Sequence, residues 1–576
     1  MLLMDPYFYI KSLTFNDDVS VTLSEGDIIV FVGSNNVGKS ETLRNIYSLM
    51  RNQDTNSCLV VKKLAYESTP DFDWLPWYEE KGFCERNENN DFVFHGNGQS
   101  GSVGSTVNLS YFNPPTESGR TFFTWFCFVA YIDTVRRLTM VDPQEASDGS
   151  IPQTPIENLY FYPEIVESFS SVFQKTFSEQ KIACDVLTSK KIILRLGEQF
   201  KASSAGQLDS SFREEGRKYY EKLPELNRQG DGMKSFSGIV LSLLFSAHSI
   251  ALIDEPESFL HPQQAYSLGQ ALANDLGAEK QIFCSTHSSY FINGLLSGGG
   301  KRVKIIRLER IMKEDGREIN PHFLLDNQGV ADLINEPMIL YTKIMDALFS
   351  DSVVICESES DCSVYSSLYA YMERSNHKYS ECIFLPTNGK AKIKNVVSSL
   401  KAFGLKLKAI VDFDFLNDEE LVKAYVSVFG GDWANFEANF KLFNQMIAVR
   451  EDQIKKTEIN DKVTNYFAQI SGDFLNKSQI KHLAEEILFK DEWDEIKTKG
   501  ISYFDGKPQK DALRKLLDSF AAIGIFIVPC GELECFVPDV KGHGISWIKN
   551  LEDKYHDFSD EAYSKIKEFL VKVLDA

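Results

Sequence analysis

The sequence predicts an α/β protein with two domains, each built around a parallel sheet. Short apolar runs alternate with helix-like stretches up to about residue 308, and the same alternation starts again at residue 352. This pattern is typical of parallel sheets, because each helix returns the chain to the edge where the next strand starts. A glycine-rich segment at residues 33–40 joins an early apolar run to the next helix, which supports the same fold class.

The bulk composition is that of a globular protein. Of the 576 residues, 43% are hydrophobic and 25% are charged, which allows about two to four domains without a disulfide scaffold. The formal net charge of −21 argues against a uniformly basic nucleic-acid binder, although it leaves room for a local basic groove. The ten cysteines form no C-x-x-C pair and fit buried thiols. No segment fits a signal peptide or a membrane span, so we expect a cytoplasmic protein.

Residues 33–40 read Gly-Ser-Asn-Asn-Val-Gly-Lys-Ser and follow the apolar run Ile28–Val32. They match the phosphate-loop pattern G-x-x-x-x-G-K-[ST] in the strand-loop-helix context that it needs. Lys39 is predicted to reach the β- and γ-phosphates of ATP, and Ser40 to hold Mg²⁺. The loop residues whose backbone is expected to cradle the phosphates are Gly33, Asn35, Asn36 and Gly38.

Two later strand ends supply companions for this loop. Asp254 and Glu255 follow the apolar run Ile250–Ile253, and His287 comes shortly after Gln281–Ser285. An aspartate at such a strand end can hold Mg²⁺, and an adjacent glutamate can orient the attacking water. Each part alone is modest, but their order along the chain favours an ATPase site over a chance match.

These motifs resemble the ABC ATPase heads of the structural-maintenance-of-chromosomes group. The resemblance makes Asp254 the Walker B aspartate, Glu255 the catalytic base and His287 the switch histidine. It also implies a signature segment before Walker B, and residues 232–238 occupy that place, with Ser237 as the expected contact to ATP. This segment departs from the usual Leu-Ser-Gly-Gly pattern. Heads of this group close as pairs, so the resemblance implies a homodimer or a larger even homo-oligomer.

Two neighbouring arginines of this half allow more than one interpretation. Arg136 and Arg137 fit either a contact to phosphate or a neighbouring subunit, or a plain surface pair. The predicted ATPase domain covers residues 1–345, with an insertion or dimerisation region at about 50–230. No stretch sustains the heptads of a long coiled coil. The ATPase domain must therefore act through a part of the protein other than a long DNA-spanning arm.

The second half gathers carboxylates after two apolar runs. Glu357 follows Val353–Cys356, and Asp412 and Asp414 follow Lys408–Val411. In an extended segment the two aspartates point to the same side, because side chains alternate along a strand. If the two strands are neighbours in a parallel sheet, these like charges need divalent cations between them. Mg²⁺ or Mn²⁺ suits such oxygen ligands, and two ions can support phosphodiester cleavage; acidic loops without a metal are the alternative.

The glutamate after the first strand and the Asp-x-Asp after a later one resemble a TOPRIM domain. Thr387–Lys390 lies between them, where TOPRIM domains often have a glycine turn. The usual Glu-Gly pair is Glu357-Ser358 here, which is a departure in the loop rather than in the carboxylates. The predicted TOPRIM domain covers residues 350–576, with a helical insertion at about 416–500.

An ABC-type head followed by TOPRIM resembles the OLD (overcoming lysogenization defect) family of nucleases. The resemblance implies an aspartate four residues after the first glutamate, a late acidic pair and a catalytic lysine. Asp361 fits the first of these, and Glu532 and Glu534 fit the acidic pair as metal ligands. Lys541 and Lys549 are both candidates for the lysine.

The OLD resemblance implies an ATP-regulated, metal-dependent DNA endonuclease. Its relatives include the nuclease subunit of the Gabija system and retron-associated effectors, which implies anti-phage defence. A co-encoded helicase, or a reverse transcriptase with its product, is a possible partner. Lys390, Lys392 and Lys394 fit a DNA path or a solvated helix face. The alternatives are an ATP-switched DNA-binding sensor or scaffold with an inactive TOPRIM domain, and a primase- or topoisomerase-like enzyme.

Overall fold

The computed structural model divides into two compact units. The first comprises Met1–Ser350 with Ala402–Gly404, and the second comprises Asp351–Lys401 with Leu405–Ala576. The predicted insertion is described only in part, and residues 104–127 lie outside the described residues. The structure describes residues 6–51, 58–80, 83–96, 99–103, 128–145, 152, 154–178, 180–201, 210–245, 248–274, 276–298, 300–326, 343–374, 381–387, 389–447, 455–471, 474–487, 492–507 and 510–576.

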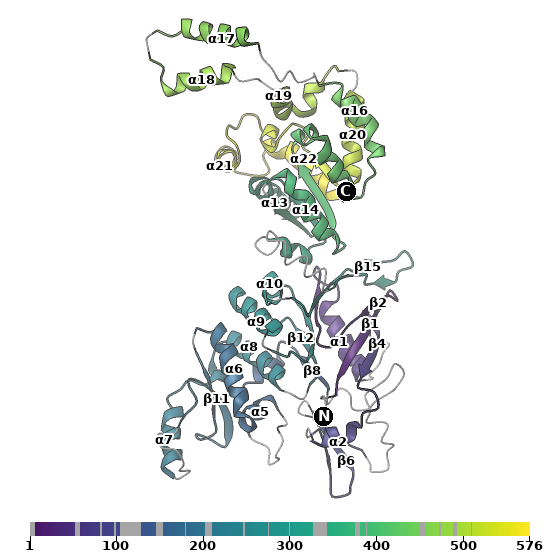
Figure 1. Ribbon diagram of the computed structural model, residues 1–576, viewed down its shortest axis with the longest axis vertical. Helices are drawn as coiled ribbons and strands as arrows, with labels where there is room; N and C mark the ends of the chain where they lie inside the picture. The colour runs from purple at the N-terminus through teal and green to yellow at the C-terminus, as the bar shows by residue number, and fades with distance from the viewer. Residues whose placement is uncertain are drawn as a thin grey trace. The chain divides into compact units, whose positions relative to one another are not determined.

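A six-stranded sheet forms the centre of the first unit (Figure 1), in the order β17-β14-β3-β13-β12-β8. Every neighbouring pair is parallel except β14 with β17. The strands are β3 (Ile28–Val32), β8 (Val129–Ile132), β12 (Ile250–Asp254), β13 (Gln281–Ser285), β14 (Val303–Leu308) and β17 (His322–Leu325). The apolar runs at residues 28–32, 250–253 and 281–285 are therefore strands of one sheet, as the sequence predicts.

Helices cover both faces of this sheet, which explains why its strands are apolar on both sides. Figure 1 shows α1 on the opposite side of the sheet from α9 and α10. The helices of the unit are α1 (Lys39–Met50), α2 (Trp74–Glu80), α4 (Arg136–Thr139), α5 (Pro155–Phe161), α6 (Pro163–Thr176), α7 (Ser210–Tyr220), α8 (Asp231–Leu244), α9 (Pro262–Asn274) and α10 (Ser289–Ser297). The 3-10 helices are η3 (Leu226–Arg228) and η4 (Lys343–Phe349).

Smaller antiparallel sheets complete the first unit. Phe15 of β1, Leu64 of β4 and Leu43 of α1 belong to one buried cluster with Phe31 of the central sheet, so the sheet β2-β1-β4 closes the core over α1. The strands of these sheets are β1 (Phe8–Phe15), β2 (Ser20–Thr22), β4 (Val61–Ser68), β5 (Cys84–Arg86), β6 (Phe92–Gly96), β7 (Gln99–Val103), β9 (Gln144–Glu145), β10 (Ile182–Asp185), β11 (Lys191–Leu196), β15 (Ile311–Met312) and β16 (Glu318–Ile319).

A four-stranded parallel sheet forms the centre of the second unit, in the order β19-β18-β20-β21. The strands are β18 (Ser352–Cys356), β19 (Cys382–Pro386), β20 (Lys406–Val411) and β21 (Ile525–Ile527). Val354 and Ile410 pack in one buried cluster with Trp547 and Leu570 near the C-terminus. Because β18 and β20 are adjacent and parallel, the residues that follow them emerge at the same edge of the sheet.

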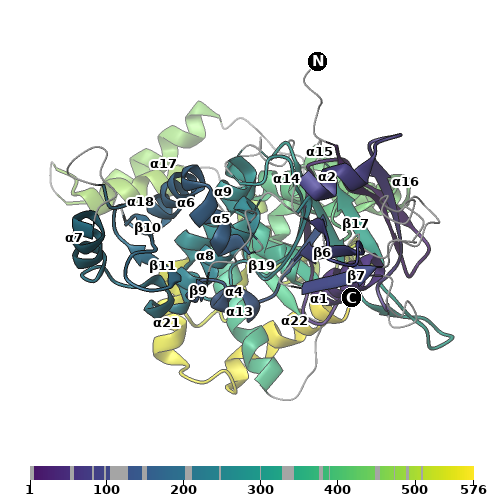
Figure 2. The same cartoon turned by 90° about the horizontal axis from the view of Figure 1, so that it is seen from below.

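The chain between β20 and β21 is largely helical, as the sequence predicts. Within it, α17 and α18 run side by side in both views (Figures 1 and 2). The helices of the unit are α13 (Glu359–Arg374), α14 (Lys390–Lys401), α15 (Glu419–Phe429), α16 (Ala434–Asn444), α17 (Lys456–Ala468), α18 (Lys477–Ile487), α19 (Glu492–Lys499), α20 (Lys510–Ala522), α21 (Ile545–Lys554) and α22 (Ser564–Asp575). The 3-10 helices are η5 (Phe413–Asn417), η6 (Gly500–Phe504), η7 (Leu533–Phe536) and η8 (Glu561–Tyr563).

One local prediction in this unit is wrong. Asp412 and Asp414 do not alternate along an extended strand, because β20 ends at Val411 and η5 begins at Phe413. The two aspartates are instead placed by a tight helical turn. Among the described residues, none of the helices combines the length and apolar character that crossing a bilayer needs.

Candidate functional site

The phosphate loop of the first unit is held in shape by its own lysine. Lys39 begins α1, and its Nζ donates hydrogen bonds to the carbonyl oxygens of Gly33 at 2.9 Å and Ser34 at 2.7 Å. A side chain at Gly33 is excluded, because a Cβ there would lie 2.5 Å from the carbonyl oxygen of Leu308. Gly38 precedes α1 in the left-handed region, at φ 98°, as does Asn36 at φ 63°. The ammonium therefore lies where phosphates bind such loops.

The predicted magnesium ligands of this unit meet. Ser40 Oγ donates to Asp254 Oδ1 at 2.8 Å, across from α1 to the end of β12. The hydroxyl of Ser285, at the end of β13, also contacts this carboxylate. A hydroxyl and a carboxylate held together in this way are the pair that phosphate-loop ATPases use for Mg²⁺. The donor set therefore fits a magnesium ion beside the phosphate loop.

The predicted catalytic glutamate has an unusual backbone. Glu255 has a φ of 46°, in the left-handed region that a non-glycine residue rarely adopts. Its carboxylate accepts a hydrogen bond from Ser258 Oγ at 2.9 Å. Arg137 is fully buried and donates to the carbonyl oxygens of Asp254 at 2.9 Å and of Glu255 at 2.8 Å. Both earlier interpretations of Arg137 are therefore wrong, because its guanidinium positions this turn from inside the unit.

The predicted switch histidine follows β13. The amide of His287 donates to Glu257 Oε1 at 2.7 Å, which ties it to the segment after β12. Burial, and then the charge of Lys39, lower the pKa of His287, so the imidazole is held in its neutral form at neutral pH. A neutral imidazole can accept or donate one hydrogen bond, which suits a group that reports on a nearby phosphate.

The structure contradicts the expected role of Ser237. This residue lies in the second turn of α8 and is completely buried, so its hydroxyl is not at the surface of the chain. A signature serine has to reach the nucleotide of another subunit. The exposed start of α8 is formed instead by Gly230 and Asp231, seven and six residues before Ser237 in the sequence. The segment therefore differs from the usual signature both in its residues and in where its exposed residues lie along the chain.

In the second unit, three predicted carboxylates converge at the edge of the sheet. Glu357 after β18 and Asp412 and Asp414 after β20 each offer an oxygen, and these oxygens lie within 4.8 Å of one another. Glu357 Oε1 accepts a hydrogen bond from the amide of Asp412 at 3.0 Å. This bond ties the ends of the two adjacent strands together. The convergence that the sequence predicts is therefore present, although η5 rather than strand alternation creates it.

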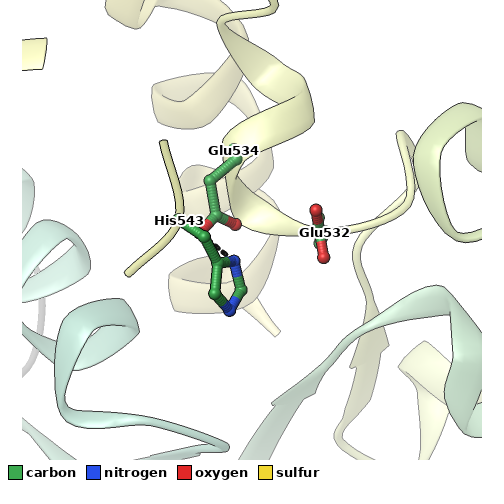
Figure 3. A group of neighbouring side chains, drawn as sticks. All are labelled: Glu532, Glu534 and His543. Atoms are coloured by element: carbon green, nitrogen blue, oxygen red, sulfur yellow. Dashed lines mark ion pairs between the residues drawn. The ribbon is translucent and has the colours of Figure 1, made fainter. Parts of the chain in front are cut away.

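The late acidic pair forms a second cluster. Glu532 and Glu534 lie after β21, and each has an oxygen within 4.8 Å of the other and of a ring nitrogen of His543. His543 Nδ1 lies 2.8 Å from Glu534 Oε1 (Figure 3). Sequence reasoning missed this histidine, and the signal available was its position between Gly542 and Gly544.

Burial and mutual repulsion act on these carboxylates. The pKa of Asp412 is raised well above its ordinary value, first by burial and then by the charge of Glu357. Burial also raises the pKa of Glu357 and of Asp361, and the charge of Glu534 adds to the effect at Asp361. Asp361 lies in the first turn of α13 and accepts a hydrogen bond from the amide of Ser358 at 3.0 Å. A divalent cation would remove this repulsion.

Two lysines other than the predicted ones contact the carboxylates. Lys390 Nζ lies 3.0 Å from Asp414 Oδ1. Lys497, at the end of α19, lies 3.5 Å from Glu532 and 3.9 Å from Asp414, so its ammonium joins the two clusters. The ammonium group of Lys497 is attracted to these carboxylates, as a divalent metal ion would be, which supports the fit of the carboxylates to such ions. The predicted Lys541 and Lys549 are exposed, and the described residues show no contact between their ammonium groups and the carboxylates.

Gly531 fixes the loop that brings Lys497 to the site. It has a φ of 119°, and a Cβ there would collide with the carbonyl oxygen of Lys497. Its own carbonyl accepts from the amide of Phe413 at 2.8 Å. We expect Gly531→Ala to lower the free energy of unfolding by about 2–4 kcal/mol, as measured by urea unfolding. Gly506→Ala is the control, because Gly506 has a φ of 80° but no atom within 4 Å of such a Cβ. Equal losses in both variants would contradict the packing argument.

The stability of the metal-free protein should depend on Asp412. Its folded pKa lies above its unfolded value, so its favourable contribution is complete below about pH 4 and is lost as the pH rises through the folded pKa. We therefore expect metal-free Asp412→Asn to melt at a higher temperature than the parent at neutral pH, and this difference to shrink towards pH 4. Mg²⁺ at neutral pH should raise the melting temperature of the parent more than that of the variant. An Asn variant less stable than the parent at neutral pH would contradict the repulsion.

Comparison with known families matches both units. Residues 153–293 match the family described as AAA domain, putative AbiEii toxin, Type IV TA system. Residues 348–414 match the family described as Overcoming lysogenization defect protein-like, TOPRIM domain. The first match includes Asp254, Glu255 and His287, and the second includes Glu357, Asp412 and Asp414. The late acidic pair and His543 lie outside the matched segments.

The chain is also similar to individual proteins. The Old nuclease of Escherichia phage P2 is 22% identical over 184 residues, which is 30% of this chain and 29% of that protein. An Smc head domain from Pyrococcus furiosus aligns with 57% of this chain and 100% of its own, at 11% identity and a TM-score of 0.34. The SMC head domain from Thermotoga maritima aligns with 55% of this chain and 97% of its own, at 12% identity and a TM-score of 0.29.

The two matched families give the class of two segments of the chain. Residues 153–293 are similar to an AAA domain, and residues 348–414 are similar to an OLD-like TOPRIM domain. This architecture is consistent with the ATPase-nucleases of the OLD family.

Proposed function

We propose that the protein is an ATP-regulated, divalent-metal-dependent DNA endonuclease. The observation that carries the proposal is a set of five carboxylates in two clusters, the first within the segment that matches an OLD-like TOPRIM domain and the second after β21, with Lys497 contacting a carboxylate of each. They are Glu357, Asp412, Asp414, Glu532 and Glu534. Their grouping in two clusters suits a two-ion centre.

In this proposal the carboxylates hold the ions and the lysines handle the charge of the substrate. Mg²⁺ or Mn²⁺, when bound, activates a water molecule and stabilises the leaving oxygen of a phosphodiester. Glu357, Asp412 and Asp414 hold one ion, and Glu532 and Glu534 hold the other. Lys390 and Lys497 form ion pairs with Asp414. A metal ion bound to Asp414 would take over its negative charge, so that the two ammonium groups would be available to the negative charge that develops on the phosphate. Lys541 and Lys549 stay candidates for this last role.

The ATPase domain would act as the regulator. Lys39, Ser40 and Asp254 are already arranged to bind a nucleotide with Mg²⁺, and Glu255 lies at the adjacent turn. We propose that ATP closes two such heads, with the exposed start of α8 reaching the nucleotide of the second head, so that the protein works as a homodimer or a larger even assembly. The insertion region at about 50–230 would supply further contacts between subunits.

Anti-phage defence is the biological role that the family likeness favours. The matched relative from phage P2 is named a nuclease, and the TOPRIM match carries the name of the same group. DNA is therefore the proposed substrate, in the cytoplasm. A co-encoded helicase, or a reverse transcriptase with its nucleic-acid product, is the proposed kind of partner.

A plasmid assay tests the proposed activity. Purified protein is incubated with supercoiled plasmid and Mg²⁺, Mn²⁺ or EDTA, with and without ATP. We expect nicked or linear products with both metals and none with EDTA. Resealed topoisomers would favour a topoisomerase, and primers made from nucleoside triphosphates would favour a primase. An intact plasmid in every condition, with DNA bound in an ATP-dependent way, would favour the sensor or scaffold.

A further inference from the structure

His543 lies beside the second carboxylate cluster in a tight turn between two glycines. Its flanking residues Gly542 and Gly544 have φ angles of 120° and 57°, both in the left-handed region. A Cβ on Gly542 would lie 3.0 Å from Ser546 Oγ and from the amide nitrogen of Trp547. The positive φ angle and these close contacts favour glycine at this position.

The same turn is anchored at both ends. The amide of His543 donates to Ser546 Oγ at 3.2 Å, and Ser546 Oγ donates back to the carbonyl of His543 at 2.8 Å. Trp547, at the start of α21, is buried in the core of the second unit. The amide of Gly544 donates to Glu534 Oε1 at 2.8 Å, so the backbone itself holds the glutamate beside the ring. His543 is thus presented to Glu534 although its side chain is 78% exposed.

The two carboxylate clusters differ in the atoms that they offer. Glu357, Asp412 and Asp414 offer oxygen only. Glu532 and Glu534 offer oxygen, and His543 adds an imidazole nitrogen within 4.8 Å of both (Figure 3). Oxygen-only sets suit Mg²⁺, whereas an imidazole favours transition-metal ions, which bind nitrogen more strongly.

We propose that Glu532, Glu534 and His543 form a mixed nitrogen and oxygen site that binds Mn²⁺ in preference to Mg²⁺, with the imidazole as a direct ligand. The proposal rests on the proposed metal centre of the TOPRIM domain and specifies the ion at one half of it. The oxygen-only cluster keeps no such preference. Loss of His543 therefore weakens Mn²⁺ binding at one cluster and leaves the other intact.

Electron paramagnetic resonance on the full-length protein tests this site without using activity. Mn²⁺ is added below the protein concentration in the presence of excess Mg²⁺, and nitrogen coupling to Mn²⁺ is measured by electron spin-echo envelope modulation. We expect ¹⁴N coupling in the parent, its loss in His543→Ala, and Mn²⁺ affinity lower by about tenfold or more in that variant. His556→Ala is the matched control, since this histidine is exposed in the same unit.

The possible outcomes separate the proposals. Mn²⁺ binding without nitrogen coupling would overturn direct ligation and leave His543 as an ion-pair partner of Glu534. Coupling that persists in His543→Ala, or no Mn²⁺ binding in excess Mg²⁺, would also overturn the site. Circular dichroism confirms that each variant is folded. Nitrogen coupling in a protein that cleaves no plasmid would support this site while refuting the proposed nuclease.

Discussion

Replacing Asp412 with alanine is expected to lower the rate of metal-dependent DNA cleavage by more than about a hundredfold while leaving ATP hydrolysis close to the parent rate. Burial and the charge of Glu357 raise the pKa of Asp412 well above its ordinary value, and the amide of Asp412 donates to Glu357 Oε1 across the two central strands. Removal of its side chain takes a ligand from the all-oxygen cluster. The ATPase motifs lie in the other unit of the chain. Plasmid cleavage and phosphate release, measured on the same preparation, check both halves of the expectation.

Asp553→Ala serves as the matched control for this experiment. Asp553 is an exposed aspartate of α21 in the same unit, and the described residues show no contact of its carboxylate. Cleavage by this variant should equal that of the parent. Cleavage by Asp412→Ala at a rate within about twofold of the parent would remove this residue from the catalytic centre.

Lys39→Ala is expected to abolish nucleotide binding and to remove the effect of ATP on DNA cleavage. The ammonium of Lys39 is buried and bonds to the carbonyls of Gly33 and Ser34, so the loop loses both its phosphate-binding charge and an internal brace. We expect ATP hydrolysis to fall by more than about a hundredfold. Cleavage should then be the same with and without ATP, whichever way ATP shifts it in the parent.

Lys63→Ala is the control for the loss of a lysine from the same unit, because Lys63 is exposed on β4. It should keep the hydrolysis rate and the ATP response of the parent. An ATP response of cleavage that survives in Lys39→Ala, with hydrolysis abolished, would refute regulation through this phosphate loop. Calorimetric titration with a non-hydrolysable ATP analogue separates lost binding from lost hydrolysis.

Local motifs made most of the fold predictable from the sequence. The apolar runs before the phosphate loop, Asp254, His287, Glu357 and Asp412 are strands, because short runs of three to five apolar residues between polar loops are typical of buried strands. Parallel pairing then follows from the alternation with helices. The polar residues follow the ends of these strands. The sequence therefore predicted Lys39 and Asp254 at the nucleotide site and Glu357 and Asp412 at the carboxylate site.

The remaining site residues depend on tertiary contacts. The sequence allowed Arg137 either a contact to phosphate or a neighbouring subunit or a place in a surface pair, and only the turn after β12 explains its burial. Lys497 comes from a helix far along the chain, and no motif marks it. Ser237 was chosen by matching a pattern that the chain has altered, and the start of α8 shows why the match fails. His543 becomes a candidate metal ligand only because it lies beside Glu534, and that position depends on the fold.

The metal centre is the central claim, and anomalous diffraction from crystals grown with Mn²⁺ tests it most directly. The account predicts one anomalous peak among Glu357, Asp412 and Asp414 and a second beside Glu532 and Glu534, with the first peak lost in Asp412→Asn. No peak at either cluster at saturating Mn²⁺, or peaks only at other surface carboxylates, would contradict it.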